Sequence, residues 1–418
     1  MLRTIRLAVS VTLLIPALAC AAARIECGDQ RHLDISYLAQ FWCVATMGAA
    51  AADGAEVDDR LDFMLRRGRL DFRGRIDADV TCRIQFAFDK LGKDAFDAVP
   101  GTPQAPGNLD FYLFDLYATY RLRADWLYLT AGYFRPQVSF ESIVSPHKVP
   151  SLDKSLVNAL VREHLVGRSQ GRETGIDLGG RTAAGTTYLC YHLGLFDTNH
   201  GKILGNAAAG GWAPLWTARL SAGLGDPPRT GYGLGCTAQF FRQRRGLTLS
   251  VDGSYQGATN QTRDGDPGNT RYSGGFRRNM VYGGDLLANY DGWNLSMECR
   301  WLHREFDDEF VAACDALTGP HYDDVVWHVR GSYEIPLPGK RFLEPAVMFS
   351  RFAADRHSSR YPSGLHEQLS CGLNWYLDRH RHRISIHYVA QDGEPVSRYA
   401  KESGRLGDYL GVGVQLTY

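Results

Sequence analysis

Apolar and polar residues alternate with period two through most of the chain from Leu61 onward. The apolar residues of one segment share one face of an extended strand, and the polar residues share the other. Strands of about ten residues with this pattern are typical of a barrel with a lipid-facing outside and a wet inside, whereas strands of soluble sandwiches are nearer five or six residues. Clear examples are residues 80–89, 247–255, 293–301, 325–335 and 369–377. The pattern therefore predicts an all-β fold, a transmembrane antiparallel β-barrel.

About sixteen such segments can be counted, each with its connection taking roughly 22 residues, as in membrane barrels. In the C-terminal half, short connections alternate with long ones, as periplasmic turns and external loops should. Two places break the rule. Residues 60–76 switch face near Gly68, and 214–277 has a short link where a long loop is expected, so a strand is missing from the count or one turn is unusually long. The segments begin near residues 60, 80, 109, 126, 172, 186, 214, 230, 246, 279, 293, 323, 341, 367, 382 and 408.

Residues 1–23 have the pattern of a secretory signal peptide. Arg3 and Arg6 precede an apolar run, Leu7–Ala19, which ends in an Ala-x-Ala cleavage pattern. The run is too short to cross a bilayer as a helix. Cys20 leaves lipidation open as an alternative, although the residue at position 17 departs from the usual lipoprotein pattern.

Residues 24–59 are expected to form a leader or short plug segment ahead of the barrel domain, residues 60–418. Ile35, Leu38, Trp42 and Ala45 follow one another at spacings of three or four, as on one face of a short helix. An alternative is that this stretch contains the true signal region.

Composition narrows the possible functions. Positive and negative side chains are equal in number, at 46 each, which argues against a nucleic-acid partner. The 45 glycines, with 21 Tyr, 19 Phe and 8 Trp, fit a β-protein with many turns and aromatic girdles. The nine cysteines form no C-x-x-C pair, so no metal site and no cofactor are expected. Cys27 and Cys43 could form a disulfide in the oxidising periplasm.

The last segment resembles the C-terminal signal of bacterial outer-membrane proteins. Apolar residues alternate up to a terminal aromatic residue: Leu410, Val412, Val414, Leu416 and Tyr418. The resemblance implies a location in the bacterial outer membrane, with the barrel-assembly machinery, membrane lipid and lipopolysaccharide as partners.

Three blocks together resemble the phosphate-selective porin O and P family. They are the arginine-rich residues 60–75, the pair 114–120 and 129–141 with Gly132-Tyr-Phe-Arg-Pro136, and residues 171–180. The resemblance implies an outer-membrane porin, usually sixteen-stranded and trimeric, in which Arg and Lys side chains line an anion path. The remainder of the chain is similar to the family in length, alternation and terminus.

The longest connection, residues 135–171, is the natural candidate for a loop folded into the pore. It is rich in basic residues, and a second basic strip lies on the two strands near residues 60 and 80. A pore selects by the charges at its narrowest point, so both sets are candidates for anion selectivity. They are Arg66, Arg67, Arg69, Arg73, Arg83, Arg135, Lys148, Lys154, Arg162, Arg168 and Arg172.

Other readings stay open. Lumen-facing arginines commonly pair with carboxylates on neighbouring strands, which would leave a general porin without selectivity. A non-conducting or enzymatic barrel is a further alternative, although neither G-x-S-x-G nor H-E-x-x-H occurs in the sequence. We therefore expect a porin for passive diffusion of small hydrophilic solutes with a preference for anions, and not an enzyme.

Overall fold

The computed structural model describes residues 23–51, 54–89, 111–167, 170–198, 213–257, 276–306, 319–355, 365–393 and 403–418. The predicted signal peptide therefore lies almost wholly outside the described residues, as does candidate Arg168. No helix among the described residues is long and apolar enough to cross a membrane.

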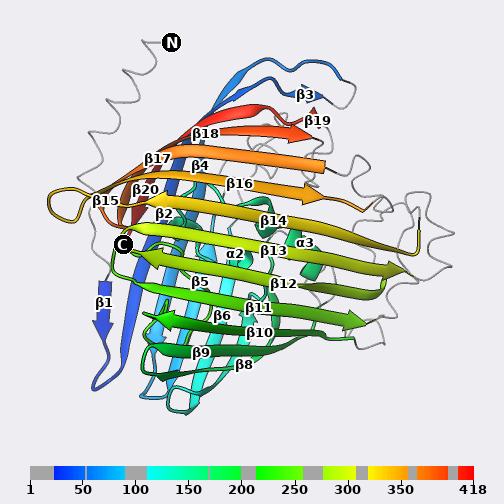
Figure 1. The fold of residues 1–418 in the computed structure, drawn as a ribbon. Coiled ribbons are helices and arrows are strands. Elements are labelled where there is room, and N and C mark those ends of the chain that lie inside the picture. Colours follow the sequence, from blue (N-terminus) through cyan, green and yellow to red (C-terminus); the bar gives the residue numbers. More distant parts are fainter. Residues whose placement is uncertain are drawn as a thin grey trace.

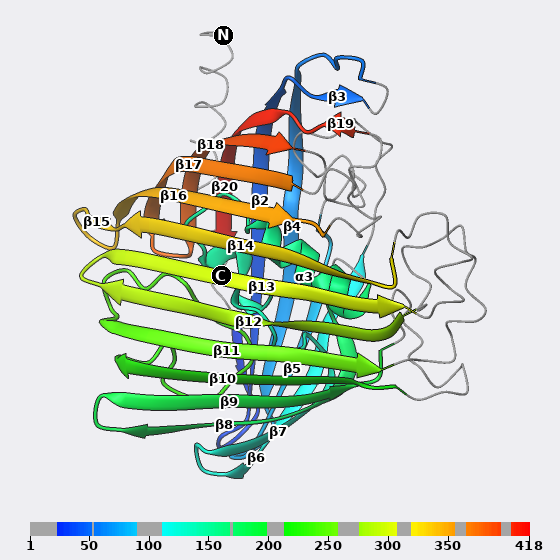
Figure 2. The same ribbon diagram turned by 45° about the vertical axis from the view of Figure 1, so that its right-hand side comes forward.

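Sixteen antiparallel strands form a closed ring, as the alternation predicts (Figures 1 and 2). Each strand pairs with the next along the chain, and β20 pairs with β2 to close the ring. The strands of the ring are β2 (His32–Met47), β4 (Arg60–Arg75), β5 (Val80–Ala87), β6 (Tyr112–Arg123), β7 (Leu127–Phe134), β8 (Glu173–Ala184), β9 (Thr187–Phe196), β10 (Leu215–Gly225), β11 (Gly246–Gly257), β12 (Phe276–Tyr290), β13 (Trp293–Phe306), β14 (His321–Tyr333), β16 (Phe342–Ala353), β17 (Leu365–Asp378), β18 (His382–Gly393) and β20 (Asp408–Thr417).

Four short strands and three helices complete the described structure. β1 (Ala23–Glu26) pairs with the start of β2, and β15 (Ile335–Pro336) pairs with the start of β16. β3 (Ala50–Ala51) and β19 (Ser403–Arg405) pair with each other beyond the ends of β2 and β20. The helices α2 (Phe140–Ile143), η2 (Pro146–Lys148) and α3 (Leu156–Val166) all follow β7.

Apolar and polar side chains lie on opposite faces of the strands, as the alternation predicts. On β11, outward Leu249 and Val251 are 53% and 61% exposed, whereas inward Ser250 and Asp252 are buried. Large aromatic side chains are exposed near both ends of the barrel, where aromatic residues meet the lipid–water interfaces. Examples are Tyr120, Trp126, Tyr290, Trp293 and Trp375 near one end and Trp216, Tyr255, Trp301 and Tyr388 toward the other.

The expected leader or plug helix at residues 24–59 is wrong for its main part, because residues 32–47 form barrel strand β2. The barrel therefore begins at His32 rather than at Arg60. The helical spacing was misleading, since Leu38 and Trp42 face the lumen and Ile35 and Ala45 lie on the opposite face of the strand. β2 takes the place in the count of the strand expected near residue 230, where the structure has none.

The expected disulfide between Cys27 and Cys43 is also wrong, because both cysteines are free. Cys27 lies in the turn before β2, and Cys43 lies eleven residues beyond the first residue of that strand. At about 3.3 Å per residue the two are about 36 Å apart, far more than a disulfide can join.

The change of face near Gly68 is a β-bulge in β4. The register between β2 and β4 shifts where Gln40 pairs with Arg67 and Phe41 pairs with Leu65, which leaves Arg66 as the extra residue. A bulge inserts one residue and re-aims its neighbours. Here it sends two consecutive guanidinium groups, those of Arg66 and Arg67, to the same carboxylate inside the barrel.

Candidate functional site: the loop inside the barrel

The connection between β7 and β8 folds into the lumen, as the sequence predicts (Figures 1 and 2). It leaves the wall just after Gly132, which has φ 139° and whose Cβ, if present, would lie 2.2 Å from the carbonyl oxygen of Leu116. Glycine is therefore needed in β7 next to β6, two residues before the strand ends at Phe134 and the loop begins. Ser139 caps α2 by accepting a hydrogen bond from the Ser142 amide at 3.1 Å, and Gly167 ends α3 in the left-handed conformation.

Buried contacts fix this loop to the wall formed by β13–β18. The Glu141 carboxylate accepts from both terminal nitrogens of Arg330 on β14, at 2.7 and 3.1 Å, and from the Ser155 amide at 2.8 Å. The Arg383 guanidinium donates to the Val149 carbonyl at 2.7 Å. Burial alone would raise the pKa of Glu141, but Arg330 holds it well below its ordinary value. The ion pair between Glu141 and Arg330 is therefore the central anchor of the loop.

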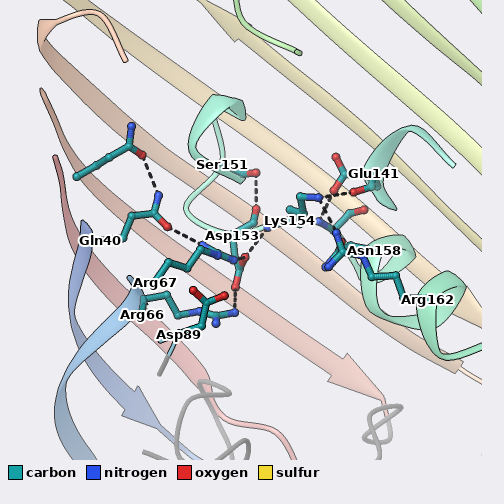
Figure 3. A network of polar contacts seen from close by, with 12 residues as sticks. Gln40, Arg66, Arg67, Asp89, Glu141, Ser151, Asp153, Lys154, Asn158 and Arg162 are labelled. Atoms are coloured by element: carbon teal, nitrogen blue, oxygen red, sulfur yellow. Dashed lines mark hydrogen bonds and ion pairs between the residues drawn. The ribbon is translucent and has the colours of Figure 1, made fainter. Parts of the chain in front are cut away.

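A second attachment joins the loop to the bulge on β4 (Figure 3). Asp153 pairs with Arg66 at 2.7 Å and with Arg67 at 2.5 Å, and Arg67 also donates to Gln40 at 2.8 Å. Burial would raise the pKa of Asp153, but the two guanidinium groups keep it well below its usual range. These two arginines therefore hold the loop, and the single carboxylate of Asp153 compensates one of their two charges.

The other candidate arginines, which lie on β4, on β5 and immediately before β8, are also paired with carboxylates. Arg69 pairs with Asp89, Arg73 and Arg83 pair with Asp71, and Arg172 pairs with Asp115 at 2.7 Å. The opposite wall has the same arrangement, in which Asp252 and Asp285 lie between Arg219 and Arg300. Pairing with carboxylates inside the barrel, the structural alternative considered from the sequence, involves this whole group.

Three cations differ, because no ion pair to a carboxylate involves them among the described residues. Arg135, Lys154 and Arg162 all donate to one backbone carbonyl, that of Ser142. Arg162 does so at 2.6 Å, and the Lys154 ammonium also donates to the Glu141 carbonyl at 2.6 Å. In Figure 3, Lys154 and Arg162 lie close together beside Glu141, separate from the contacts of Arg66 and Arg67 with Asp153. We call Arg135, Lys154 and Arg162 the cation cluster.

The cation cluster carries electrostatic strain. Burial, with the charges of Arg162 and Arg135, lowers the pKa of Lys154 well below its ordinary value. Burial and neighbouring guanidinium groups lower the pKa of Arg135 and of Arg162 in the same direction. A backbone carbonyl supplies only a partial negative charge, so an anion arriving here would reduce the mutual repulsion.

Lys148 is a further cation without a carboxylate partner among the described residues. It is half-buried at the end of η2, and burial with three nearby guanidinium groups lowers its pKa to about 8. Those groups belong to Arg229, Arg73 and Arg83. Arg73 is 61% and Arg83 23% exposed at the side chain, so this part of the wall remains accessible.

Two functional features were not identified from the sequence. One is the anchor role of Arg330, which by alternation alone is one more inward arginine. The other is residues 226–245, whose unusual length was noticed but whose position inside the lumen was not. Three cations also converge on a single backbone carbonyl. This convergence depends on the fold of the loop, which the spacing of residues in the sequence does not reveal.

Comparisons with known proteins agree with this architecture. Residues 46–218 match the family model described as phosphate-selective porin O and P. No curated protein sequence matches the chain. Among solved structures, the barrel is similar to OmpF of Salmonella typhi in complex with daunomycin, with a TM-score of 0.56, 11% identity, and coverage of 95% of this chain and 100% of that one.

Two other solved structures have comparable scores. The outer-membrane channel DcaP of Acinetobacter baumannii has a TM-score of 0.53 and 13% identity, covering 96% of this chain and 100% of that one. The anion-selective porin from Comamonas acidovorans has a TM-score of 0.51 and 10% identity, covering 93% and 100%. Both the family match and the fold point to a channel. The family match over residues 46–218 and the sixteen-stranded barrel together support a porin of the bacterial outer membrane, similar to the phosphate-selective porins O and P.

Proposed function

We propose that this porin allows passive diffusion of small hydrophilic solutes with a preference for anions, phosphate-like ions among them, and that the cation cluster sets this preference. The observation that carries the proposal is the convergence of Arg135, Lys154 and Arg162 on one carbonyl, with no carboxylate partner in the described part of the chain. Cations held in a narrow, low-dielectric passage raise the local concentration of anions. A family match to phosphate-selective porins and a fold similar to an anion-selective porin support the same preference.

Reversal potentials test the preference directly. The purified protein is inserted into a planar bilayer between two KCl concentrations, and the sign of the zero-current potential reports the more permeant ion. We expect the sign of the zero-current potential to show that chloride is the more permeant ion. A block of the chloride current by phosphate would indicate a phosphate-binding site. A cation preference, or no preference, would favour the alternative of a general porin.

Lys148 should make the preference depend on pH. Because the pKa of Lys148 is about 8, its ammonium group is charged at pH 7 and loses its proton as the pH rises toward 9. We expect the ratio of anion to cation permeability to fall across this interval in reversal-potential measurements. Lys148→Arg keeps the charge throughout and should remove the dependence; a wild-type profile in that variant would contradict the assignment.

The remaining inferences concern biogenesis and assembly. We infer that residues 1–23 are removed as a signal peptide, and that the barrel-assembly machinery reads Leu410, Val412, Val414, Leu416 and Tyr418. The outward position of the four aliphatic residues on β20 supports this role. We also propose a homotrimer, with lipopolysaccharide contacting the external loops. Native mass spectrometry of the detergent-solubilised protein would measure the subunit number.

A further inference from the structure

The connection between β10 and β11, residues 226–245, is much longer than the neighbouring turns at the same end of the barrel. Those turns need only Gly185 and Thr186 between β8 and β9, or Asp291 and Gly292 between β12 and β13. The two ends of the long connection are already joined, since the Asp226 amide donates to the Arg245 carbonyl at 2.8 Å. A short turn would therefore suffice to close this hairpin, and the additional residues serve another purpose.

Most of this connection packs inside the barrel. The Phe241 ring lies 5.2 Å from that of Phe342 and 5.0 Å from that of Tyr376, and all three are buried. Gln239 donates to the Glu344 carboxylate on β16 at 2.7 Å. Arg244 donates to Thr248 at 2.6 Å. We call residues 226–245 the inward connection.

A strained turn holds the inward connection to the wall. Phe241 and Arg242 have φ of 51° and 62°, a conformation unfavourable for residues with a side chain. Their consecutive amides donate to the two carboxylate oxygens of Glu334, at 2.8 and 2.6 Å. Glu334 is fully buried, in the segment between β14 and β15. Two charge-assisted hydrogen bonds can offset the strain of this turn.

The inward connection also meets the loop that enters from the opposite end of the barrel. Val144 of the loop and Cys236 form a parallel β-bridge, and the Gly235 amide donates to Gln137 at 2.8 Å. Phe140, Val144 and Val149 of the loop share one apolar cluster with Ala238. The lumen is therefore crossed by two segments, from opposite ends, that contact each other in the middle.

Together these segments cover most of the described inner wall and leave it most accessible near the adjoining ends of β4 and β5. On the covered wall, Asn294, Glu344 and Asn374 are buried. On the opposite wall, the Arg73 side chain is 61% exposed. A cavity remains between the inward connection and β8–β12, lined in part by Arg181, Tyr188, Arg219, Arg229 and Tyr232.

We propose that the inward connection is a second constriction of the pore, which together with the loop sets the largest solute that can pass. It narrows the end of the barrel opposite the loop's entry, and it confines solutes to the part of the lumen lined by β4–β6, because its Tyr232 stacks on Tyr128 of β7 and donates to Asp177 of β8. Glu334 fixes its position by holding the strained turn. Size exclusion thus resides in the inward connection, while charge selection resides in the cation cluster.

The decisive experiment removes the inward connection. Residues 227–244 are replaced by Asn-Gly, a sequence suited to a two-residue hairpin turn between the paired residues Asp226 and Arg245. We expect single-channel conductance to rise by at least about twofold, because the open cross-section at the constriction widens. Liposome swelling should show entry of larger uncharged sugars. The reversal potential should keep its sign, since the cation cluster is untouched, so size and charge are tested separately.

A matched control and two milder variants complete the test. Pro338→Asn creates the same Asn-Gly turn between β15 and β16 and should leave conductance unchanged. Glu334→Ala removes the acceptor for Phe241 and Arg242 and should increase conductance or current fluctuations by about twofold even if the larger replacement fails to fold. Val144→Cys should form a disulfide with Cys236 on oxidation, which mass spectrometry detects.

The outcomes are distinct. A folded replacement variant with the conductance and sugar size limit of the wild type would overturn the proposal, as would wild-type currents in Glu334→Ala. Absence of the disulfide in Val144→Cys would show that the inward connection is not docked on the loop, and the constriction as described would then be wrong.

Discussion

Replacing Arg135, Lys154 and Arg162 together by glutamine should abolish the anion preference of this porin. Glutamine retains an amide that can donate to the Ser142 carbonyl, so the loop keeps a hydrogen-bond partner while three charges are lost. With an effective dielectric constant of about 20, one charge about 10 Å from a passing ion contributes about 1.7 kcal/mol. Because about 1.4 kcal/mol corresponds to a tenfold ratio, we expect the anion-to-cation permeability ratio to fall by at least about tenfold.

Reversal potentials at low ionic strength are the appropriate measurement, since salt screens the charges. Arg381→Gln removes one positive charge from an exposed turn and should change the ratio little. Arg66→Gln would test a lumen arginine that shares its carboxylate partner, Asp153, with Arg67. If the triple variant retains the wild-type ratio, selectivity is set elsewhere, and the paired arginines of β4 and β5 become the candidates.

Glu141→Ala should release the loop from the wall and enlarge the pore. The substitution leaves Arg330 buried without its carboxylate, and breaking such a pair costs about 3–5 kcal/mol. The Ser155 amide loses its acceptor as well. We expect conductance to rise about threefold with larger current fluctuations, because a pore's conductance follows its narrowest section. The loop should also become sensitive to protease while the barrel stays folded.

The matched control for the anchor is Arg121→Ala, which breaks an exposed ion pair with Asp79 at the barrel end. Exposed pairs contribute little, so conductance and protease resistance should stay at wild-type values. Wild-type conductance and an uncleaved loop in Glu141→Ala would mean that the contacts of Asn374 and Arg383 with the loop suffice to hold it.

Alternation predicted the barrel well wherever one face of a strand meets lipid and the other meets polar side chains. β11 and β13 are examples, and their predicted and observed starts agree closely. The inward-folded loop was predicted from its length and from Gly132. These features depend on local pattern, which a single sequence carries.

β2 was missed because its inward face carries the apolar residues Leu38, Trp42 and Val44 in its C-terminal half. Trp42 and Val44 face the lumen, where they pack with Leu152 of the loop in one buried cluster. Apolar residues therefore occur on both faces of β2, and the period of two disappears. Only knowledge of what covers the inner face could have restored the strand.

The prediction of a strand near residue 230 was wrong for the converse reason. Tyr232, Leu234, Cys236, Ala238 and Phe240 alternate with other residues as in a barrel strand. Cys236, Ala238 and Phe240 do bury against apolar neighbours, but these neighbours are in the loop and on β12 rather than in lipid. Alternation indicates that one face of a segment is in an apolar environment. It does not show whether that environment is lipid or protein.

The candidate site was predicted by residue type but not by role. Of the basic residues proposed, those on β4 and β5 have carboxylate partners, while the cation cluster and Lys148 have none within the ranges that the structure describes. Partners such as Asp153 and Asp115 lie far from these arginines in sequence, so compensation could not be judged before the fold was known.

The pairing of β20 with β2 has a consequence for how the protein folds. These strands are the last and the first of the ring, and Tyr37 and Tyr418 exchange backbone hydrogen bonds where they meet. Until β20 is in place, a partly assembled sheet has two unpaired edges, which can pair with other chains. The final pairing joins residues almost the whole chain apart, the kind of contact that forms slowly. Aggregation during assembly should therefore be governed by the time these two edges remain open.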